Sequence, residues 1–311
     1  MLHVRVASPP DVTGQLVETL VADKGVLNLV VLPGAARRPD RDAVQFDLRQ
    51  GSANPVFRQL RGLGLDERGS IMVQAVDAAL TDAPPPAAIP GTRHGEVAPV
   101  WEMVEAGIRD GGVYAPSFFG LLIIAGLIAC VGILTNSQIL VVGAMVVGPE
   151  YNAIIAVALG IERWRPSMVR RGLVALLCGF LLAIAAAVVF GVAIRWSGRT
   201  PALFHLGVRP VANLIDSPNL FSVVVAVLAG VVGVVSLTES RANALIGVFI
   251  SVTTIPAAAA LGLSLAYQSW SRAWGSTEQL LLNVGLLILV GAAGLRIQRF
   301  IWRPRARRGS A

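Results

Sequence analysis

A single acidic side chain lies within the apolar part of this sequence. Glu150 is the only formally charged residue in six long apolar stretches, and it follows Pro149 directly, with Asn152 two positions later. A charged side chain in a membrane costs about 2.5–3.5 kcal/mol on insertion scales, so an intramembrane carboxyl usually faces the interior of a helix bundle or water. We expect Glu150 to exchange a proton or to bind a cation together with backbone carbonyls. A carboxyl that only packs between helices is the alternative.

Prolines interrupt two of the apolar stretches. Pro149 lies in the second stretch, and Pro256 lies in the fifth. A proline inside a helix removes a backbone donor and obstructs the carbonyl one turn earlier, which produces a kink or a break. Breaks at matching places in two halves of a membrane protein are typical of a binding site near the membrane midplane. The candidate site residues are Glu150, Asn152, Gly148, Pro149, Thr253, Thr254, Pro256, Asn136 and Asn283. The sequence leaves open whether a metal ion binds there.

The apolar stretches predict membrane-spanning helices. The chain has 311 residues, of which 54% are hydrophobic and only 14% charged, which excludes an ordinary soluble enzyme. Each stretch has close to the ~20 residues that cross a bilayer as a helix, and such continuous runs do not alternate as barrel strands do. We therefore predict an α-helical polytopic membrane protein with six transmembrane helices. The stretches cover 117–134, 139–161, 172–194, 220–237, 244–267 and 280–295.

Two groups of three stretches resemble each other. A Thr-x-Ser pair ends the first stretch at Thr135 and the fourth at Thr238, and in both groups a proline and then Ala-Leu-Gly follow, at 158–160 and 260–262. Because three is odd, a second three-helix copy would be inverted in the membrane relative to the first. We predict a 3+3 inverted repeat. Chance similarity between apolar segments is the alternative.

The N-terminal part has the pattern of a separate domain. Its apolar periodicity predicts the order strand, helix, strand, strand, helix, strand. The second strand is expected to end before Pro33-Gly34, which lead with a charged turn to the third, and the second helix to open at Asn54-Pro55. This order is typical of a ferredoxin-like fold, so we predict an N-terminal α+β ferredoxin-like cytoplasmic domain. The predicted parts are this domain at 1–81, a Pro-rich linker at 82–95, an amphipathic helix at 96–115, the transmembrane domain at 116–297 and a basic tail at 298–311.

Arginines flank the apolar stretches unevenly. The chain opens with an alternating strand pattern rather than a signal peptide, so we expect a cytoplasmic N-terminus. Eleven arginines then fall in cytoplasmic loops and the tail, and four in outer loops, as the positive-inside rule requires. We predict a multi-pass protein of the cytoplasmic (inner) membrane with both termini in the cytoplasm. The net charge of +7 orients helices in this interpretation and does not indicate nucleic-acid binding.

Two motifs in the membrane part are typical of a known family. The first is Gly132-Ile133-Leu134-Thr135-Asn136-Ser137, followed by Gly143-Ala144-Met145 and a proline four residues on; the second is Ser217-Pro218-Asn219-Leu220 and Ala244-Leu245-Ile246-Gly247 with Pro256. Over roughly residues 115–297 the chain resembles the bacterial "uncharacterised hydrophobic domain" membrane family, a domain of unknown function. Its members often have two successive prolines where this chain has Pro256-Ala257, and a Pro-rich polar stretch at Gly148-Pro149-Glu150. The resemblance implies no activity.

These observations predict transport rather than catalysis. Motifs such as His-Glu-x-x-His and Gly-x-Ser-x-Gly are absent from the sequence, so we expect no enzymatic activity and no cofactor. We predict a secondary transporter of a small solute or ion, proton- or cation-coupled, with its site at the broken second and fifth helices. A membrane-anchored sensor or scaffold with a ligand-binding cytoplasmic domain, or an oligomeric channel, is the alternative. The expected partners are membrane lipid, the small solute or ion and further copies of the chain in a homo-oligomer, but no nucleic acid.

Overall fold

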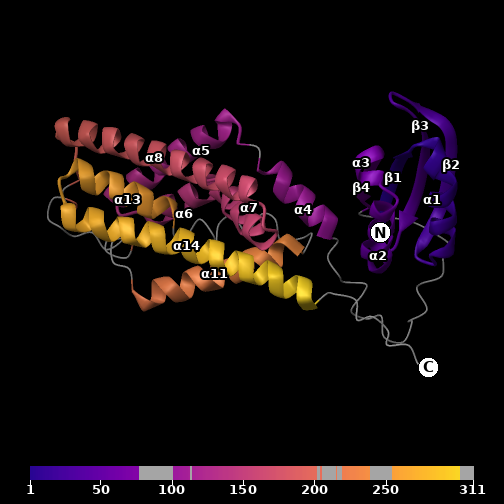
Figure 1. The fold of residues 1–311 in the computed structure, drawn as a ribbon. Coiled ribbons are helices and arrows are strands. Elements are labelled where there is room, and N and C mark those ends of the chain that lie inside the picture. The colour runs from indigo at the N-terminus through magenta and orange to yellow at the C-terminus, as the bar shows by residue number, and fades with distance from the viewer. Residues whose placement is uncertain are drawn as a thin grey trace. The chain divides into compact units, whose positions relative to one another are not determined.

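The computed structural model contains two compact units, Met1–Ala106 and Gly107–Ala311 (Figure 1). It describes residues 1–76, 101–112, 114–201, 204, 215, 219–238 and 254–301. The predicted linker at 82–95 and most of the predicted tail lie outside these residues. The chain is a multi-pass membrane protein by helix length and hydropathy, preceded by an α+β unit.

A four-stranded antiparallel sheet organises the first unit. Its strands lie in the order β2-β3-β1-β4, so that β1 pairs with β3 on one side and with β4 on the other. The register places Val4 opposite both Phe46 and Val73. The strands are β1 Leu2–Ser8, β2 Val26–Arg37, β3 Asp40–Leu48 and β4 Ser70–Ala75. The helices are α1 Pro10–Ala22, α2 Gln50–Gly62 and the short α3 Leu65–Arg68.

Alternation along the central strands builds the core of this unit. Every second side chain of β1 is fully buried, from Leu2 through Val4 to Val6. Burial of one face is what period-two alternation produces in a half-covered sheet. These side chains form one hydrophobic core with apolar side chains from β3 and from the two long helices α1 and α2. The contributing residues are Val44, Phe46, Leu48, Leu16, Leu20, Val56 and Leu60.

Two local predictions for this unit are wrong. The second strand does not end before Pro33-Gly34, because β2 continues through these residues to Arg37 and the chain turns into β3 at Arg38-Pro39. Gly34 has a φ of 62° and its amide donates to Asp42 on β3 at 2.7 Å, so the left-handed residue lies within an irregular stretch of the β2–β3 pairing. The second helix opens at Gln50, and Pro55 lies inside it.

Helix α4, Trp101–Asp110, lies where the sequence predicts an amphipathic helix. Within the first unit, the backbone N–H of Trp101 donates to Asn54 Oδ1 at 3.4 Å.

The second unit is a bundle of apolar helices. Among the described residues, four helices are long and apolar enough to span a membrane: α5 Pro116–Leu134, α8 Pro166–Trp196, α11 Leu220–Thr238 and α14 Trp270–Ile301. A fifth span is formed if the bent pair α6 Gln138–Val147 and α7 Glu150–Glu162 is counted together. The shorter apolar helix α13 covers Ile255–Ala266, and residues 244–253 of the predicted fifth stretch lie outside the described residues.

The second apolar stretch is broken at the predicted proline. Helix α6 ends at Val147, and α7 begins at Glu150 after Gly148 and Pro149. The two helices are bent by 54° relative to each other. Pro256 is the second residue of α13, where the missing N–H of proline costs no helical hydrogen bond.

The helices of this unit fall into two groups with the same spacing along the chain. Helices α11 and α14 begin 104 residues after α5 and α8, and α13 ends 104 residues after α7. Helix α8 packs against α5, α7 and α13, whereas α14 packs against α11, α13 and α7. The last long helix of each group therefore packs against the short helix of the other group.

Small residues allow the two crossings between the groups. A Cβ added at Gly262 of α13 would lie against Ala187 of α8 and 2.8 Å from the carbonyl oxygen of Ile184. A Cβ added at Gly291 of α14 would lie 3.1 Å from the Cβ of Ala158 on α7. Close helix approach at small residues is the usual packing mode inside membranes.

Candidate functional site

The break between α6 and α7 lies beside the start of α13 in the core of the second unit. Thr254 Oγ1 donates a hydrogen bond of 2.9 Å to Glu150 Oε1. Glu150 is the first residue of α7, and Thr254 directly precedes α13. Both residues are fully buried, with 0% of their surface exposed. Residues that are 104 positions apart in the chain thus form one polar contact inside an apolar bundle.

Gly148 makes room for this contact. A Cβ added at Gly148 would overlap Ile255 Cδ1 and Glu150 Oε2. The absence of a side chain therefore lets the end of α6, the carboxyl group and the start of α13 come together. Pro149 holds the position before α7 with φ −92° and ψ 7°, which turns the chain between the two half-helices.

The electrostatics of the site favour negative charge. The N-terminus of a helix carries roughly half a positive charge from its unpaired N–H groups. Helix α7 has 13 residues and begins at Glu150, and α13 has 12 residues and begins beside Thr254. A carboxylate in the first turn of one helix, bonded at the start of the other, is stabilised by both ends. A cation would meet the same two positive ends and is disfavoured unless the carboxylate balances it.

The other predicted site residues lie in different surroundings. Asn152 is exposed, and its side chain lies beside Gly111, where an added Cβ would be 3.4 Å from Asn152 Cγ. Asn136 lies in the turn between α5 and α6 with φ 55°. Asn283 is fully buried on α14, and Gln279 Nε2 donates to its Oδ1 at 3.1 Å. Thr253 lies outside the described residues.

Sequence reasoning missed two polar groups of this bundle. Tyr151, directly after the acidic residue, donates from its hydroxyl to the carbonyl oxygen of Gly233 on α11 at 2.9 Å. Gln279 is 5% exposed and forms a buried amide pair with Asn283. The available signal was the spacing of Gln279 and Asn283, since residues four apart on a helix lie on one face.

The site has the chemistry of a single carboxyl group. No group of three or more His, Cys, Asp or Glu side chains that could hold a metal ion occurs in the part of the chain that the structure describes. A lone carboxyl beside a hydroxyl can take up and release a proton, because the hydroxyl can donate to the ionised form and accept from the neutral form.

Comparison with known proteins gives one match. Residues 145–289 match the family described as Domain of unknown function (DUF389). This region of the chain belongs to that membrane-protein family. The prediction from the two sequence motifs is thereby confirmed. The match begins in α6 and ends in α14, so the break between α6 and α7 and the Glu150–Thr254 contact lie within the DUF389 region. Among curated proteins and solved structures, nothing matches the chain.

Proposed function

We propose that this DUF389 protein is a secondary transporter of a small solute or ion, and that Glu150 exchanges a proton during transport. The observation that carries the proposal is the buried hydrogen bond between Glu150 and Thr254, which lie at the starts of the two short helices α7 and α13. Paired half-helix ends near the midplane are the usual construction of a transporter binding site.

An inverted repeat of two three-helix halves supports this function. The constant spacing of 104 residues makes Glu150 and Thr254 equivalent positions of the two halves, so their hydrogen bond lies where a pseudo-two-fold axis would pass. The reciprocal crossings agree, since each joins one proposed half to the other: the contact of Ala187 with Gly262 becomes that of Gly291 with Ala158 when the two halves are exchanged. A two-fold relation requires such reciprocal contacts. Rocking of one half against the other about the fixed site would give alternating access.

The helix ends repeat the same relation. Arg195, near the end of α8, donates to the carbonyl oxygen of Ala266, the last residue of α13, at 3.0 Å. Arg299, near the end of α14, binds Glu162, the last residue of α7, at 3.1 Å. The two arginines are 104 residues apart. Both cross from one proposed half to the other.

The proposed architecture has six spans and a ferredoxin-like domain. Residues 244–253 together with α13 would complete the sixth span and, with six spans, both termini lie on one side. The arginine bias places that side in the cytoplasm. For the first unit, the order β1-α1-β2-β3-α2-β4 and the sheet order β2-β3-β1-β4 support a ferredoxin-like fold.

The proposed coupling ion is the proton rather than a metal cation. Two helix N-termini converge on one carboxylate, and this surplus of positive ends opposes a bound cation. Protonation of Glu150 removes the negative charge that the two helix ends stabilise. The positive helix ends then remain without that charge, which favours entry of an anionic solute. A proton and an anion would then share the pathway.

Flux measurements in proteoliposomes test the proposal. Purified protein is reconstituted around a trapped pH indicator, and gradients of small anions and cations are imposed one at a time. We expect at least one solute gradient to drive a pH change in vesicles with the natural protein, and the Glu150→Gln variant to abolish it. Glu278→Gln, which changes an exposed carboxyl on α14, provides the control and is expected to retain the flux. A solute-driven pH change that survives Glu150→Gln would refute the role of Glu150.

A further inference from the structure

Tyr151 bonds the start of α7 to a helix of the other group. Its hydroxyl donates to the carbonyl oxygen of Gly233 on α11 at 2.9 Å. Gly233 is buried and Tyr151 is half-buried. A carbonyl oxygen has two lone pairs, so it can accept this bond together with a helical N–H. A tyrosine hydroxyl inside an apolar bundle needs a partner, and the Gly233 carbonyl supplies it.

This bond acts on the same helix turn that contains the acidic side chain. Tyr151 follows Glu150 directly in the first turn of α7. Consecutive side chains of a helix point about 100° apart around its axis. Glu150 binds Thr254 at the start of α13, whereas Tyr151 binds α11. Two bonds in different directions restrict rotation of the first turn, so the direction of the Glu150 carboxyl depends on the bond that Tyr151 makes.

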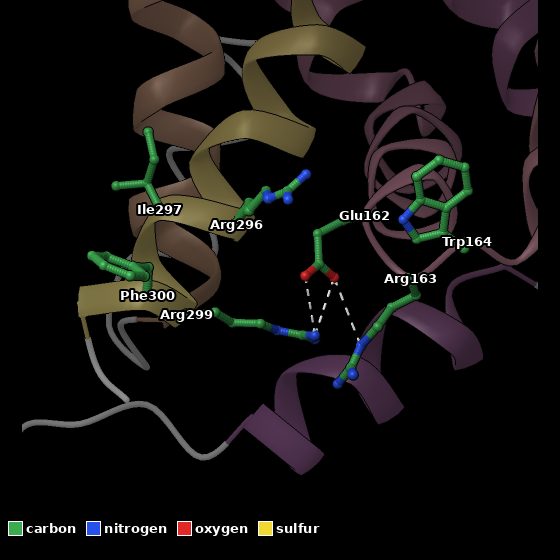
Figure 2. A pocket seen from close by; sticks show the side chains of 7 residues that line it. All are labelled: Glu162, Arg163, Trp164, Arg296, Ile297, Arg299 and Phe300. Carbon is green, nitrogen blue, oxygen red and sulfur yellow. Dashed lines mark hydrogen bonds and ion pairs between the residues drawn. The ribbon is translucent and has the colours of Figure 1, made fainter. Parts of the chain in front are cut away.

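The rest of α7 is held by separate contacts with α14. Figure 2 shows the Glu162 carboxylate between Arg299, with an ion pair of 3.1 Å, and Arg163 Nε, at 3.7 Å. Farther along α7, Ala158 lies against Gly291, where an added Cβ would be 3.1 Å from the Cβ of Ala158. These contacts should keep α7 packed if Tyr151 loses its hydroxyl. The effect of that loss should therefore be confined to the first turn.

The hydroxyl and the carboxyl come from the same proposed half. With the spacing of 104 residues, Tyr151 corresponds to Ile255, just as Glu150 corresponds to Thr254. Ile255 offers no hydrogen bond, and its Cδ1 would overlap a Cβ added at Gly148. The half that supplies the ionisable side chain thus also supplies the neighbouring hydroxyl, which is the arrangement expected if Tyr151 serves Glu150.

We propose that Tyr151 is a positioning residue for Glu150 and holds its carboxyl toward Thr254 while the proton is exchanged. This inference rests on the proposed function. Without the Tyr151 hydroxyl, the first turn of α7 is free to rotate and the carboxyl to leave the hydroxyl of Thr254. Proton exchange would then no longer take place in one defined geometry, and its coupling to the solute would weaken.

Tyr151→Phe tests this role, because it keeps the ring and removes only the hydroxyl. The C=O stretch of neutral Glu150 depends on the hydrogen bonds of the carboxyl, so we expect its infrared band to shift or broaden. The solute-driven pH change should fall about tenfold, as for the loss of one hydrogen bond. Tyr267→Phe is the matched control, since the Tyr267 hydroxyl pairs with that of Thr200 at 2.8 Å at the other end of α13. It should leave both band and flux unaltered.

A double-mutant cycle with Thr254→Val separates positioning from a general loss of packing. If Tyr151 acts through the Glu150–Thr254 contact, Tyr151→Phe should destabilise the Thr254→Val protein less than the natural protein in mixed micelles. Tyr267→Phe should destabilise both equally. Additive effects of Tyr151→Phe and Thr254→Val would overturn the inference, as would an unchanged Glu150 band. A natural protein without any solute-driven pH change would instead refute transport, and the cycle would still decide whether Tyr151 positions Glu150.

Discussion

At the scale of residues, one hydrogen bond carries the proposed function. A buried carboxyl in an apolar bundle is costly, and here a hydroxyl at the start of α13 bonds to it. The sequence predicted that both residues belong to the site, since Glu150 is the only charged residue within the apolar stretches and Thr254 lies two residues before Pro256. It could not predict that the two touch, because periodicity within each helix does not define how one helix packs on another.

Removing the hydroxyl of Thr254 should destabilise the bundle. Thr254→Val keeps the shape of the side chain but takes away a donor to a buried carboxyl, so we expect a loss of about 1–3 kcal/mol in the free energy of unfolding. Titration with a denaturing detergent in mixed micelles measures it. Thr277→Val is the control, because Thr277 bonds only to the carbonyl of Ala273 on its own helix. If both variants lose the same stability, the contact with Glu150 has no special role.

The first unit contains a carboxyl with a shifted pKa. Burial alone would raise the pKa of Asp47, but hydrogen bonds from Asn28 at 2.7 Å and from His3 at 2.8 Å lower it below its usual value. A lowered pKa in the folded state means that ionised Asp47 stabilises the unit above the unfolded pKa of about 3.9. This stabilisation is lost as the pH falls through the lower folded value.

We therefore expect the stability difference between the natural protein and Asp47→Asn to be pH-dependent. It should be constant from neutral pH down to about pH 5 and then shrink toward about pH 2. Hydrogen exchange of peptides from β1 and β3, corrected for the intrinsic rate at each pH, reports this difference in the full-length protein. A difference that stays the same at low pH would mean that the hydrogen bonds do not depend on the charge of Asp47.

At the scale of elements, Pro149 of the membrane part was informative and the prolines of the first unit were not. Pro149 breaks the second stretch between α6 and α7, because proline has no backbone N–H to donate and its ring obstructs the carbonyl one turn earlier. Pro33 and Pro55 instead lie within β2 and α2. Pairing with β3 and burial of apolar side chains such as Val56 outweigh the local preference there. Long-range packing of this kind has no local sequence signal.

The crossing of α13 and α8 should tolerate no added side chain. Gly262→Ala would press a methyl group on Ala187 and on the backbone of Ile184, so we expect a loss of about 1–3 kcal/mol in stability. Gly285→Ala on α14 places its methyl group in open space and should be neutral or slightly stabilising, since alanine favours helix more than glycine. Unfolding in mixed micelles compares the two. A Gly262→Ala variant as stable as Gly285→Ala would show that the helices do not cross so closely.

At the scale of the whole molecule, the sequence predicted the repeat that we propose, but in a different register from the one that the helix bounds support. The sequence match pairs Ala-Leu-Gly at 158–160 with 260–262, a spacing of 102. The helix bounds give 104, which pairs Ala158 with Gly262. Turn geometry agrees, because Trp164 and Gln268 both have a left-handed φ, of 53° and 56°. Leu, Ala and Gly are so common in membrane helices that a shift of two residues leaves the apparent similarity unchanged.

The proposed register relates the two residues of the buried contact. With a spacing of 104, Glu150 and Thr254 occupy equivalent positions of the two proposed halves, and of these two side chains Glu150 has the carboxyl group. The proposed repeat would make the two groups of helices symmetric, while only one of the two paired side chains, Glu150, can hold a proton. Such an arrangement suits a site that opens to either side of the membrane and carries a single proton.

The protonation of Glu150 is the most direct test of this account. Infrared difference spectroscopy of reconstituted protein detects the C=O stretch of a neutral buried carboxyl. Spectra are recorded as the pH is changed between about pH 5 and pH 9. The account predicts a band that grows reversibly as the pH is lowered, that shifts in heavy water, and that is absent in Glu150→Gln but present in Glu278→Gln. A Glu150 carboxyl that keeps one protonation state across this range would contradict it.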